Sequence, residues 1–265
     1  MKYDFGFIGC GNMGGALIKA LAKTVDVKKI AVCDFFQDKA KAFEKELGVV
    51  CSNAEEIAKE CEFIVLAVKP QNMSDTLKPL REILKNREDV CLISMAAGLS
   101  ISAIKEYAGN DFPVIRIMPN TPCTLGAGMV LYCTDKVSKA QETAFLTAFS
   151  SAGKIDKIEE SKIDAASALS GCGPAFVYMF AEALADGAVE CGVPRDKAIL
   201  YASQTLLGAA EMLLAFGHPG DLKDAVCSPG GTTIAGVHSL EKSGFRNAAM
   251  DAVLSAYKRT LELKK

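Results

Sequence analysis

The feature that most restricts the fold is an alternation of short apolar runs with helical patterns over the first 156 residues. Phe63–Val68 reads FIVLAV, a continuous apolar run that is typical of a parallel strand covered on both faces. Strands that alternate with helices predict a parallel, doubly wound sheet with right-handed crossovers. The predicted strands are 5–8, 29–33, 63–68, 90–94, 114–118 and 129–133, and the predicted helices are 16–22, 39–47, 73–84, 101–107 and 139–151.

The pattern changes after residue 156, and no strand pattern follows residue 161. Glycine- and proline-rich breakers separate the helical signals in this part of the chain. The predicted helices are 163–169, 175–191, 195–216 and 245–263. We therefore predict an α/β domain over residues 1–156 and an all-α domain over residues 157–265.

A glycine-rich segment joins the first predicted strand to the first predicted helix. It consists of Gly9, Cys10, Gly11, Asn12, Met13 and Gly14, which fit the pattern GxGxxG. The first glycine allows a tight turn, the second lets the backbone approach a pyrophosphate, and the third permits close helix–strand packing. The helix N-terminus attracts the phosphates. This context predicts an N-terminal Rossmann dinucleotide-binding domain, and the alternative is a glycine-rich turn without a ligand.

Asp34 ends the second predicted strand, 20 residues beyond Gly14. An acid at this position accepts hydrogen bonds from the ribose 2′-OH and repels a 2′-phosphate, so it favours NADH over NADPH. The nearest cations, Lys39 and Lys41, lie in the next predicted helix. The alternative is a solvated aspartate in a turn.

Further candidates follow the carboxyl ends of the later strands, where ligands bind in open α/β sheets. Val68, Lys69 and Pro70 follow the FIVLAV run, and the small residues around Ala97 leave room for a flat ring. Asn120 lies between two prolines in a loop that also follows the carboxyl end of a predicted strand, at the level of the ligand crevice. The alternative for Lys69 is a surface lysine before a turn, and the alternative for the small residues around Ala97 is tight packing. The alternative for the loop of Asn120 is a structural turn.

The C-terminal half has one strong candidate site, the segment Ser228-Pro-Gly-Gly-Thr-Thr233. A glycine pair followed by hydroxyls and a helical run presents free backbone N–H groups, which suit a carboxylate or a phosphate. The alternative is ordinary capping of a helix by Ser or Thr.

Composition excludes several classes of function. Lys and Arg number 30 against 32 Asp and Glu, so no diffuse surface for nucleic acid is expected. Only two histidines occur, and no two of the ten cysteines are closer than ten residues, so we predict no metal site. The N-terminus lacks the pattern of a signal peptide, and we expect reduced cysteines in a cytoplasmic protein.

Ala198–Phe216 is the segment most similar to a membrane span. It contains Ser203, Gln204, Thr205 and Glu211. We expect a buried core helix or a subunit-interface helix rather than a membrane span.

Several segments occur together in one order, namely GFIGCGNMG, AVKPQ, MPNTP, LSGCGPAF, HPGDLKDAVCSPGGTTI and EKSGFR. With them the sequence resembles the pyrroline-5-carboxylate reductase family over residues 3–262. The resemblance implies an N-terminal Rossmann domain and a C-terminal helical dimerisation domain. Family homodimers interlock these helices, and some members stack dimers into decamers. The resemblance also implies a reaction, the NAD(P)H-dependent reduction of 1-pyrroline-5-carboxylate to L-proline, which is the final step of proline biosynthesis.

The resemblance also implies roles for individual residues. Thr233 is the expected catalytic residue, whose hydroxyl hydrogen-bonds the imine nitrogen. The implied substrate-binding residues are Glu160, Ser228, Gly230, Gly231, Thr232 and Thr233. The implied cofactor-binding residues are Gly9, Cys10, Gly11, Asn12, Met13, Gly14, Asp34, Asn53, Val68, Lys69, Pro70, Ala97 and Asn120.

The chain departs from the family pattern at two positions. Members that favour NADPH usually carry Ser, Thr or Arg where this chain has Asp34. Ala225 stands where a larger or polar residue is common, so we expect one cofactor contact to be missing.

Two alternatives remain at the level of the sequence. A β-hydroxyacid dehydrogenase would be expected to use a catalytic lysine on a C-terminal helix, but Lys162 is the only lysine in residues 161–180. A nucleotide-sensing protein without activity would keep the glycine-rich segment but would not need the segment from Ser228 to Thr233. The sequence does not decide between NADH and NADPH, nor does it give the oligomer size or any feedback regulation.

Overall fold

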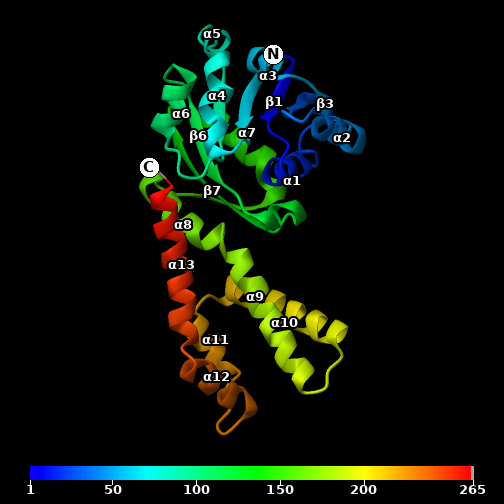
Figure 1. Cartoon of the computed structure of the whole chain (residues 1–265), viewed down its shortest axis with the longest axis vertical. Helices are drawn as coiled ribbons and strands as arrows, with labels where there is room; N and C mark the ends of the chain where they lie inside the picture. Colours follow the sequence, from blue (N-terminus) through cyan, green and yellow to red (C-terminus); the bar gives the residue numbers. More distant parts are fainter. Residues whose placement is uncertain (264–265) are drawn as a thin grey trace. The chain divides into compact units, whose positions relative to one another are not determined.

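The computed structural model describes residues 1–263, which form two compact units (Figure 1). The first unit contains Met1–Cys172 and the last turns of the chain from Ala256 onward, and the second contains Gly173–Ser255. The predicted boundary between residues 156 and 157 falls at the end of the last strand, whereas the first compact unit extends to Cys172.

The first unit is built on an eight-stranded sheet with the order β3-β2-β1-β4-β5-β6-β7-β8. The strands are β1 (Tyr3–Ile8), β2 (Ile30–Cys33), β3 (Val50–Cys51), β4 (Cys61–Leu66), β5 (Cys91–Ser94), β6 (Val114–Met118), β7 (Gly128–Asp135) and β8 (Gly153–Lys157). All neighbouring strands are parallel except β6 and β7. The predicted α/β fold with a Rossmann domain is therefore confirmed, with one antiparallel pair that was not expected.

Helices cover both faces of this sheet. Alternate residues of β4 enter different apolar clusters, with Ile64 and Leu66 in one and Phe63 and Val65 in the other. This is the arrangement predicted from the continuous apolar run. The helices are α1 (Asn12–Leu21), α2 (Gln37–Leu47), α3 (Ala54–Glu60), α4 (Met73–Leu77), α5 (Arg81–Leu84), α6 (Ile101–Ala108), α7 (Lys139–Phe149) and α8 (Glu160–Ser170).

Some elements of the first unit differ from the prediction. The predicted helix 73–84 is divided into α4, a 3-10 turn (Lys78–Leu80) and α5, because Pro79 removes a backbone donor. The strands β3 and β8 were not predicted. β3 has only two residues, and β8 reads GKIDK and lies mostly exposed at the sheet edge, so neither has a clear apolar pattern.

The second unit is helical, and no strand occurs between residue 161 and residue 263, as predicted. The helices are α9 (Gly173–Glu190), α10 (Arg195–Phe216), α11 (Pro219–Ala225), α12 (Thr232–Lys242) and α13 (Phe245–Glu262), of which the last turns of α13 belong to the first unit. α11 was not predicted, because the glycine- and proline-rich breakers around it concealed its short helical pattern, whereas α12 is the helical run expected after the glycine pair at 230–231.

The second unit has almost no core of its own. Among its residues 173–255, the buried side chains are Ala185, Ala198 and Ala202. Large apolar side chains are exposed instead, including Leu214 at 89% and Met179 at 70%. The segments Glu160–Glu190 and Arg195–Phe216 are long and apolar enough to cross a membrane by length and composition. An apolar surface of this extent requires a covering partner or environment.

Candidate coenzyme site and substrate segment

The glycine-rich segment forms a tight turn between β1 and α1. Gly9 has a φ of +109°, and a Cβ atom there would lie 2.5 Å from the carbonyl oxygen of Ala67. A Cβ atom at Gly14 would lie 2.5 Å from the carbonyl oxygen of Gly9, so the helix and the strand are in close contact. A Cβ atom at Gly11 would meet nothing within 4 Å. The space above Gly11 therefore lies open at the N-terminus of α1, where an anion is favoured.

Asp34 links this turn to the end of β2. Its Oδ2 accepts a hydrogen bond of 2.7 Å from the backbone N–H of Cys10, and its Oδ1 accepts one of 2.9 Å from the N–H of Phe36. Each carboxylate oxygen thus already has one backbone donor. Asp34 stabilises the turn in addition to any contact with a ligand.

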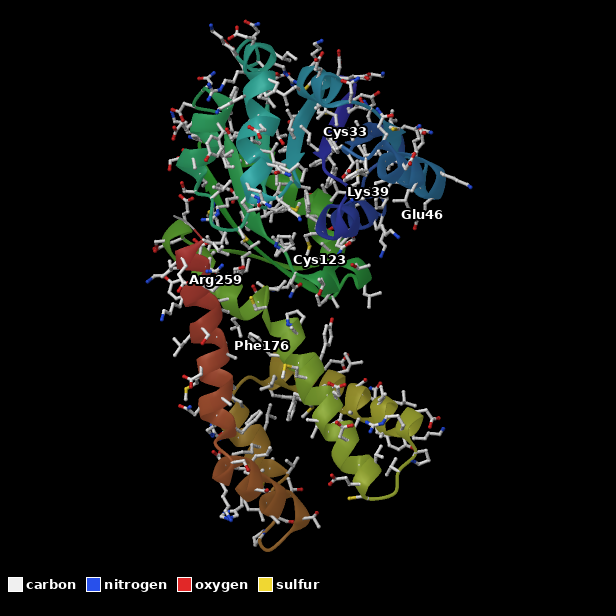
Figure 2. All side chains as sticks on the ribbon, viewed as in Figure 1. Cys33, Lys39, Glu46, Cys123, Phe176 and Arg259 are labelled. Atoms are coloured by element: carbon white, nitrogen blue, oxygen red, sulfur yellow. The ribbon has the colours of Figure 1, made fainter. Side chains whose placement is uncertain are left out.

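A cavity of about 670 Å³ opens beside the glycine-rich turn. It brings together six of the predicted cofactor-binding residues, which are Gly9, Gly11, Asp34, Asn53, Val68 and Lys69. The other predicted cofactor-binding residues, which are Cys10, Asn12, Met13, Gly14, Pro70, Ala97 and Asn120, do not line it. The cavity also contains Phe35, Phe36 and Lys39. Lys39 belongs to α2 and lies on the same side of the first unit as Glu46 (Figure 2).

Asn53 and Ala97 occupy different places at this edge of the sheet. Asn53 is the N-cap of α3, where its Oδ1 accepts a hydrogen bond of 2.9 Å from the N–H of Glu56. Ala97 is exposed in the turn after β5. Pro70 begins a 3-10 turn (Pro70–Asn72) after β4.

The thiols next to the glycine-rich turn are not nucleophiles. Cys10 donates a hydrogen bond of 3.4 Å from its Sγ to the carbonyl oxygen of Cys33. Burial, together with the nearby charge of Asp34, raises the pKa of each of these two thiols to about 12. Both side chains therefore stay protonated near neutral pH.

Asn120 connects three elements through its side chain. Its Oδ1 accepts a hydrogen bond of 2.9 Å from the N–H of Met129, and its Nδ2 donates one of 2.9 Å to the carbonyl oxygen of Ser170. The loop after β6 is thereby held to β7 and to the end of α8. The role of Asn120 in coenzyme binding stays a prediction, while its role in holding α8 is visible.

A buried ionic cluster holds the other end of α8 to the sheet. Arg116 of β6 is 2% exposed, and its Nη2 lies 2.5 Å from Oδ1 of Asp164, whose side chain is 6% exposed. Its Nη1 lies 3.6 Å from Oε1 of Glu160. The same Glu160 oxygen accepts a hydrogen bond of 2.6 Å from the N–H of Ile101 at the start of α6. α8 is thus held at both ends by polar contacts within the first unit.

Glu160 also lines a second cavity, of about 850 Å³, on the first unit. Other residues of this cavity include Ser102, Lys105 and Asp135, and Lys105 forms an ion pair with Asp135. The visible contacts of Glu160 are those that position α8, and its role in substrate binding stays a prediction. No group of three or more metal-ligating side chains occurs within residues 1–263.

The remaining predicted substrate residues lie together in the second unit, at the start of α12. Gly231 is the N-cap of this helix, and a Cβ atom there would lie 2.4 Å from Oγ of Ser228. Gly230 has a φ of +68°, and the N–H of Gly231 donates a hydrogen bond of 3.0 Å to the carbonyl oxygen of Ser228. Thr232 and Thr233 are exposed in the first turn of α12. A helix N-terminus favours an anion, and the role of this segment in substrate binding stays a prediction.

Four residues in this geometry were not predicted from the sequence. Phe35 and Phe36 line the cavity next to Asp34, and the sequence signal that would have identified them is two consecutive aromatics in a turn after a strand. The pairing of Arg116 with Asp164 joins residues 48 positions apart, and no local pattern predicts it.

The comparisons with known proteins agree with this geometry. Residues 160–263 match a family model described as pyrroline-5-carboxylate reductase dimerisation, and residues 4–98 match one described as NADP oxidoreductase coenzyme F420-dependent. The chain is 42% identical to the pyrroline-5-carboxylate reductase of Pisum sativum, over 99% of this chain and 96% of that protein. The chain belongs to the pyrroline-5-carboxylate reductase family. The enzyme of Escherichia coli K12 is 39% identical over the full length of both chains.

Solved structures of this family have the same fold. A pyrroline carboxylate reductase from Plasmodium falciparum, solved with NADP bound, has a TM-score of 0.89 at 34% identity and covers 100% of both chains. The family member from Coxiella burnetii has a TM-score of 0.90 at 31% identity, again over 100% of both chains. The family resemblance predicted from the sequence is confirmed, and the chain is an oxidoreductase. The β-hydroxyacid dehydrogenase and the nucleotide sensor are no longer needed as alternatives.

Proposed function

We propose that this chain is a pyrroline-5-carboxylate reductase, which reduces the C=N bond of 1-pyrroline-5-carboxylate to give L-proline in the final step of proline biosynthesis. The observation that carries this proposal is identity of 39–42% over essentially the whole chain with reductases of this name. The open space above Gly11, at the helix N-terminus, fits a pyrophosphate. When bound at this turn, NAD(P)H would supply the hydride.

The residues of this chain have to position the reactants rather than exchange protons. A protonated imine is already electrophilic, so holding the two reactants close together in the right orientation would account for much of the rate. We assign the imine nitrogen to the hydroxyl of Thr233 and the substrate carboxylate to the turn from Ser228 to Thr232. His218 is the N-cap of α11, and the mechanism uses neither of the two histidines.

The coenzyme preference is expected to lean toward NADH. Asp34 lines the cavity, and its charge opposes a 2′-phosphate by up to a few kcal/mol at an effective dielectric of about 20. About 1.4 kcal/mol already gives a tenfold difference in affinity. Steady-state rates with 1-pyrroline-5-carboxylate should therefore show kcat/KM with NADH at least as high as with NADPH.

Two variants make this measurement specific. Asp34→Ser should shift the ratio toward NADPH, and so should an arginine in place of Phe35. Asp38 lies outside the cavity in the first turn of α2, so Asp38→Ser changes the same charge and should leave the ratio unchanged. A wild-type kcat/KM at least tenfold higher with NADPH would contradict the assignment of Asp34.

We also propose a homodimer built on the second unit, with assembly into decamers as a further step. The match of residues 160–263 to the dimerisation family supports this, and so do the exposed apolar faces of α9 and α10. In this proposal a second copy covers these helices, and the protein works in the cytoplasm without a membrane or nucleic acid partner.

Light scattering at micromolar concentration tests this assembly. We expect a mass of at least twice the 28.1 kDa of one chain. Leu214 is 89% exposed on α10, so Leu214→Glu should shift the mass toward the monomer, whereas Leu125→Glu in the first unit should not. A wild-type mass of 28.1 kDa would contradict the proposal.

A further inference from the structure

Two consecutive aromatic side chains stand exposed at the coenzyme cavity. Phe35 is 94% exposed and Phe36 is 62% exposed, and both line the cavity of about 670 Å³ beside the glycine-rich turn. Phenylalanine is among the residues most often buried in folded proteins. An adjacent pair of them at the mouth of a ligand cavity therefore indicates a contact surface.

The fold holds this pair in a defined position. The N–H of Phe36 donates to Oδ1 of Asp34 at 2.9 Å, while Oδ2 of the same carboxylate binds the N–H of Cys10. The aromatic turn is thus tied to the glycine-rich turn through one side chain. The two rings lie edge to face, with centroids 5.3 Å apart and an interplanar angle of 88°.

A cation completes the surface. Nζ of Lys39 lies 5.2 Å from the centroid of the Phe36 ring, within the range of a cation–π contact. Lys39 also lines the cavity, so its positive charge and the negative charge of Asp34 face the same space.

We propose that Phe35 and Phe36 form the surface on which the adenine ring of the coenzyme stacks, and that Lys39 is the group that favours a 2′-phosphate against Asp34. The inference rests on the proposed function only in requiring an adenine dinucleotide as ligand. Stacking uses the face of the base, so it contributes equally for NADH and NADPH. The ratio between them then depends on Lys39 and Asp34.

The test is calorimetric binding of ADP-ribose and of 2′-phospho-ADP-ribose to the full-length protein. Phe35→Ala should weaken both ligands by on the order of tenfold, a typical cost of losing the ring on which a base stacks. The Phe36 ring is perpendicular to that of Phe35 and has Lys39 over its face, so Phe36→Ala should weaken both ligands less. Lys39→Gln should weaken 2′-phospho-ADP-ribose several-fold and leave ADP-ribose within twofold.

Matched variants separate stacking from simple apolar contact. Phe35→Trp keeps a ring and should retain affinity, whereas Phe35→Leu keeps apolar surface without a ring and should be weak. Leu125→Ala removes another exposed apolar side chain, at 84% exposure and outside this cavity, and should change neither affinity. Phe35 and Phe36 are exposed, so these variants should fold as the wild type does.

The outcomes distinguish this inference from the proposed function. Unchanged affinities in both alanine variants, or equal binding by Phe35→Leu and the wild type, would overturn the stacking surface. Failure of the wild type to bind either ligand would overturn the stacking surface and the proposed function together. Weaker binding by the alanine variants, in a protein that does not reduce 1-pyrroline-5-carboxylate, would support the inference and contradict the function alone.

Discussion

Replacement of Thr233 by alanine should lower kcat/KM for 1-pyrroline-5-carboxylate by on the order of 10- to 1000-fold, as is typical when one oriented hydrogen-bonding partner is lost. Thr233 lies in the first turn of α12, directly after the Gly230–Gly231 turn. Its side chain makes no hydrogen bond within residues 1–263, so the hydroxyl is free to contact a ligand. The measurement is steady-state kinetics with purified protein.

The control for this prediction is Thr233→Ser, which keeps the hydroxyl and should retain most of the activity. The unfolding midpoints of both variants should stay near that of the wild type, because the side chain is exposed. Wild-type rates in a folded Thr233→Ala protein would remove this residue from the mechanism.

Replacement of Arg116 by methionine should destabilise the protein by about 3–5 kcal/mol, the usual cost of removing one partner from a buried ion pair. The change takes away the guanidinium that lies 2.5 Å from Asp164 and leaves that carboxylate in a buried site. It also removes the contact with Glu160, which helps to hold α8. Urea unfolding at a fixed protein concentration measures the effect.

Two further variants test the cause of this loss. Arg116→Met combined with Asp164→Leu removes both charges and should recover much of the stability, because buried pairs can be replaced by apolar groups of similar size. Lys59→Met breaks an exposed pair with Glu55 and should cost less than about 1 kcal/mol. If Arg116→Met costs no more than Lys59→Met, the pair contributes little to stability.

The parts of the fold that the sequence predicted are those with strong local signals. The continuous apolar run of β4, the glycine-rich turn and the change to helices after the last strand each depend on neighbouring residues alone. The turn has the geometry that the three glycines imply, with Gly9 at positive φ, open space above Gly11 and close packing at Gly14.

The parts that could not be predicted depend on contacts between distant residues. The coenzyme role of Asn120 stays a prediction, but the hydrogen bonds of its side chain with Met129 and with Ser170, which is 50 positions away, were not predicted. β7 runs antiparallel to β6, because the loop that joins them is too short for the crossover that a parallel pair needs. Sequence spacing gives no sign of the contacts of Asn120, whereas the short loop between β6 and β7 is a signal for the reversal that the prediction did not use.

The small core of the second unit has a consequence for how this protein folds. Three buried alanines cannot offset the chain entropy of 83 residues, which costs on the order of 1–2 kcal/mol per residue. In the proposed homodimer, the surface that a second copy covers would supply the missing free energy. Under this proposal, folding of the second unit and association would be one bimolecular event, and dilution alone would unfold the second unit.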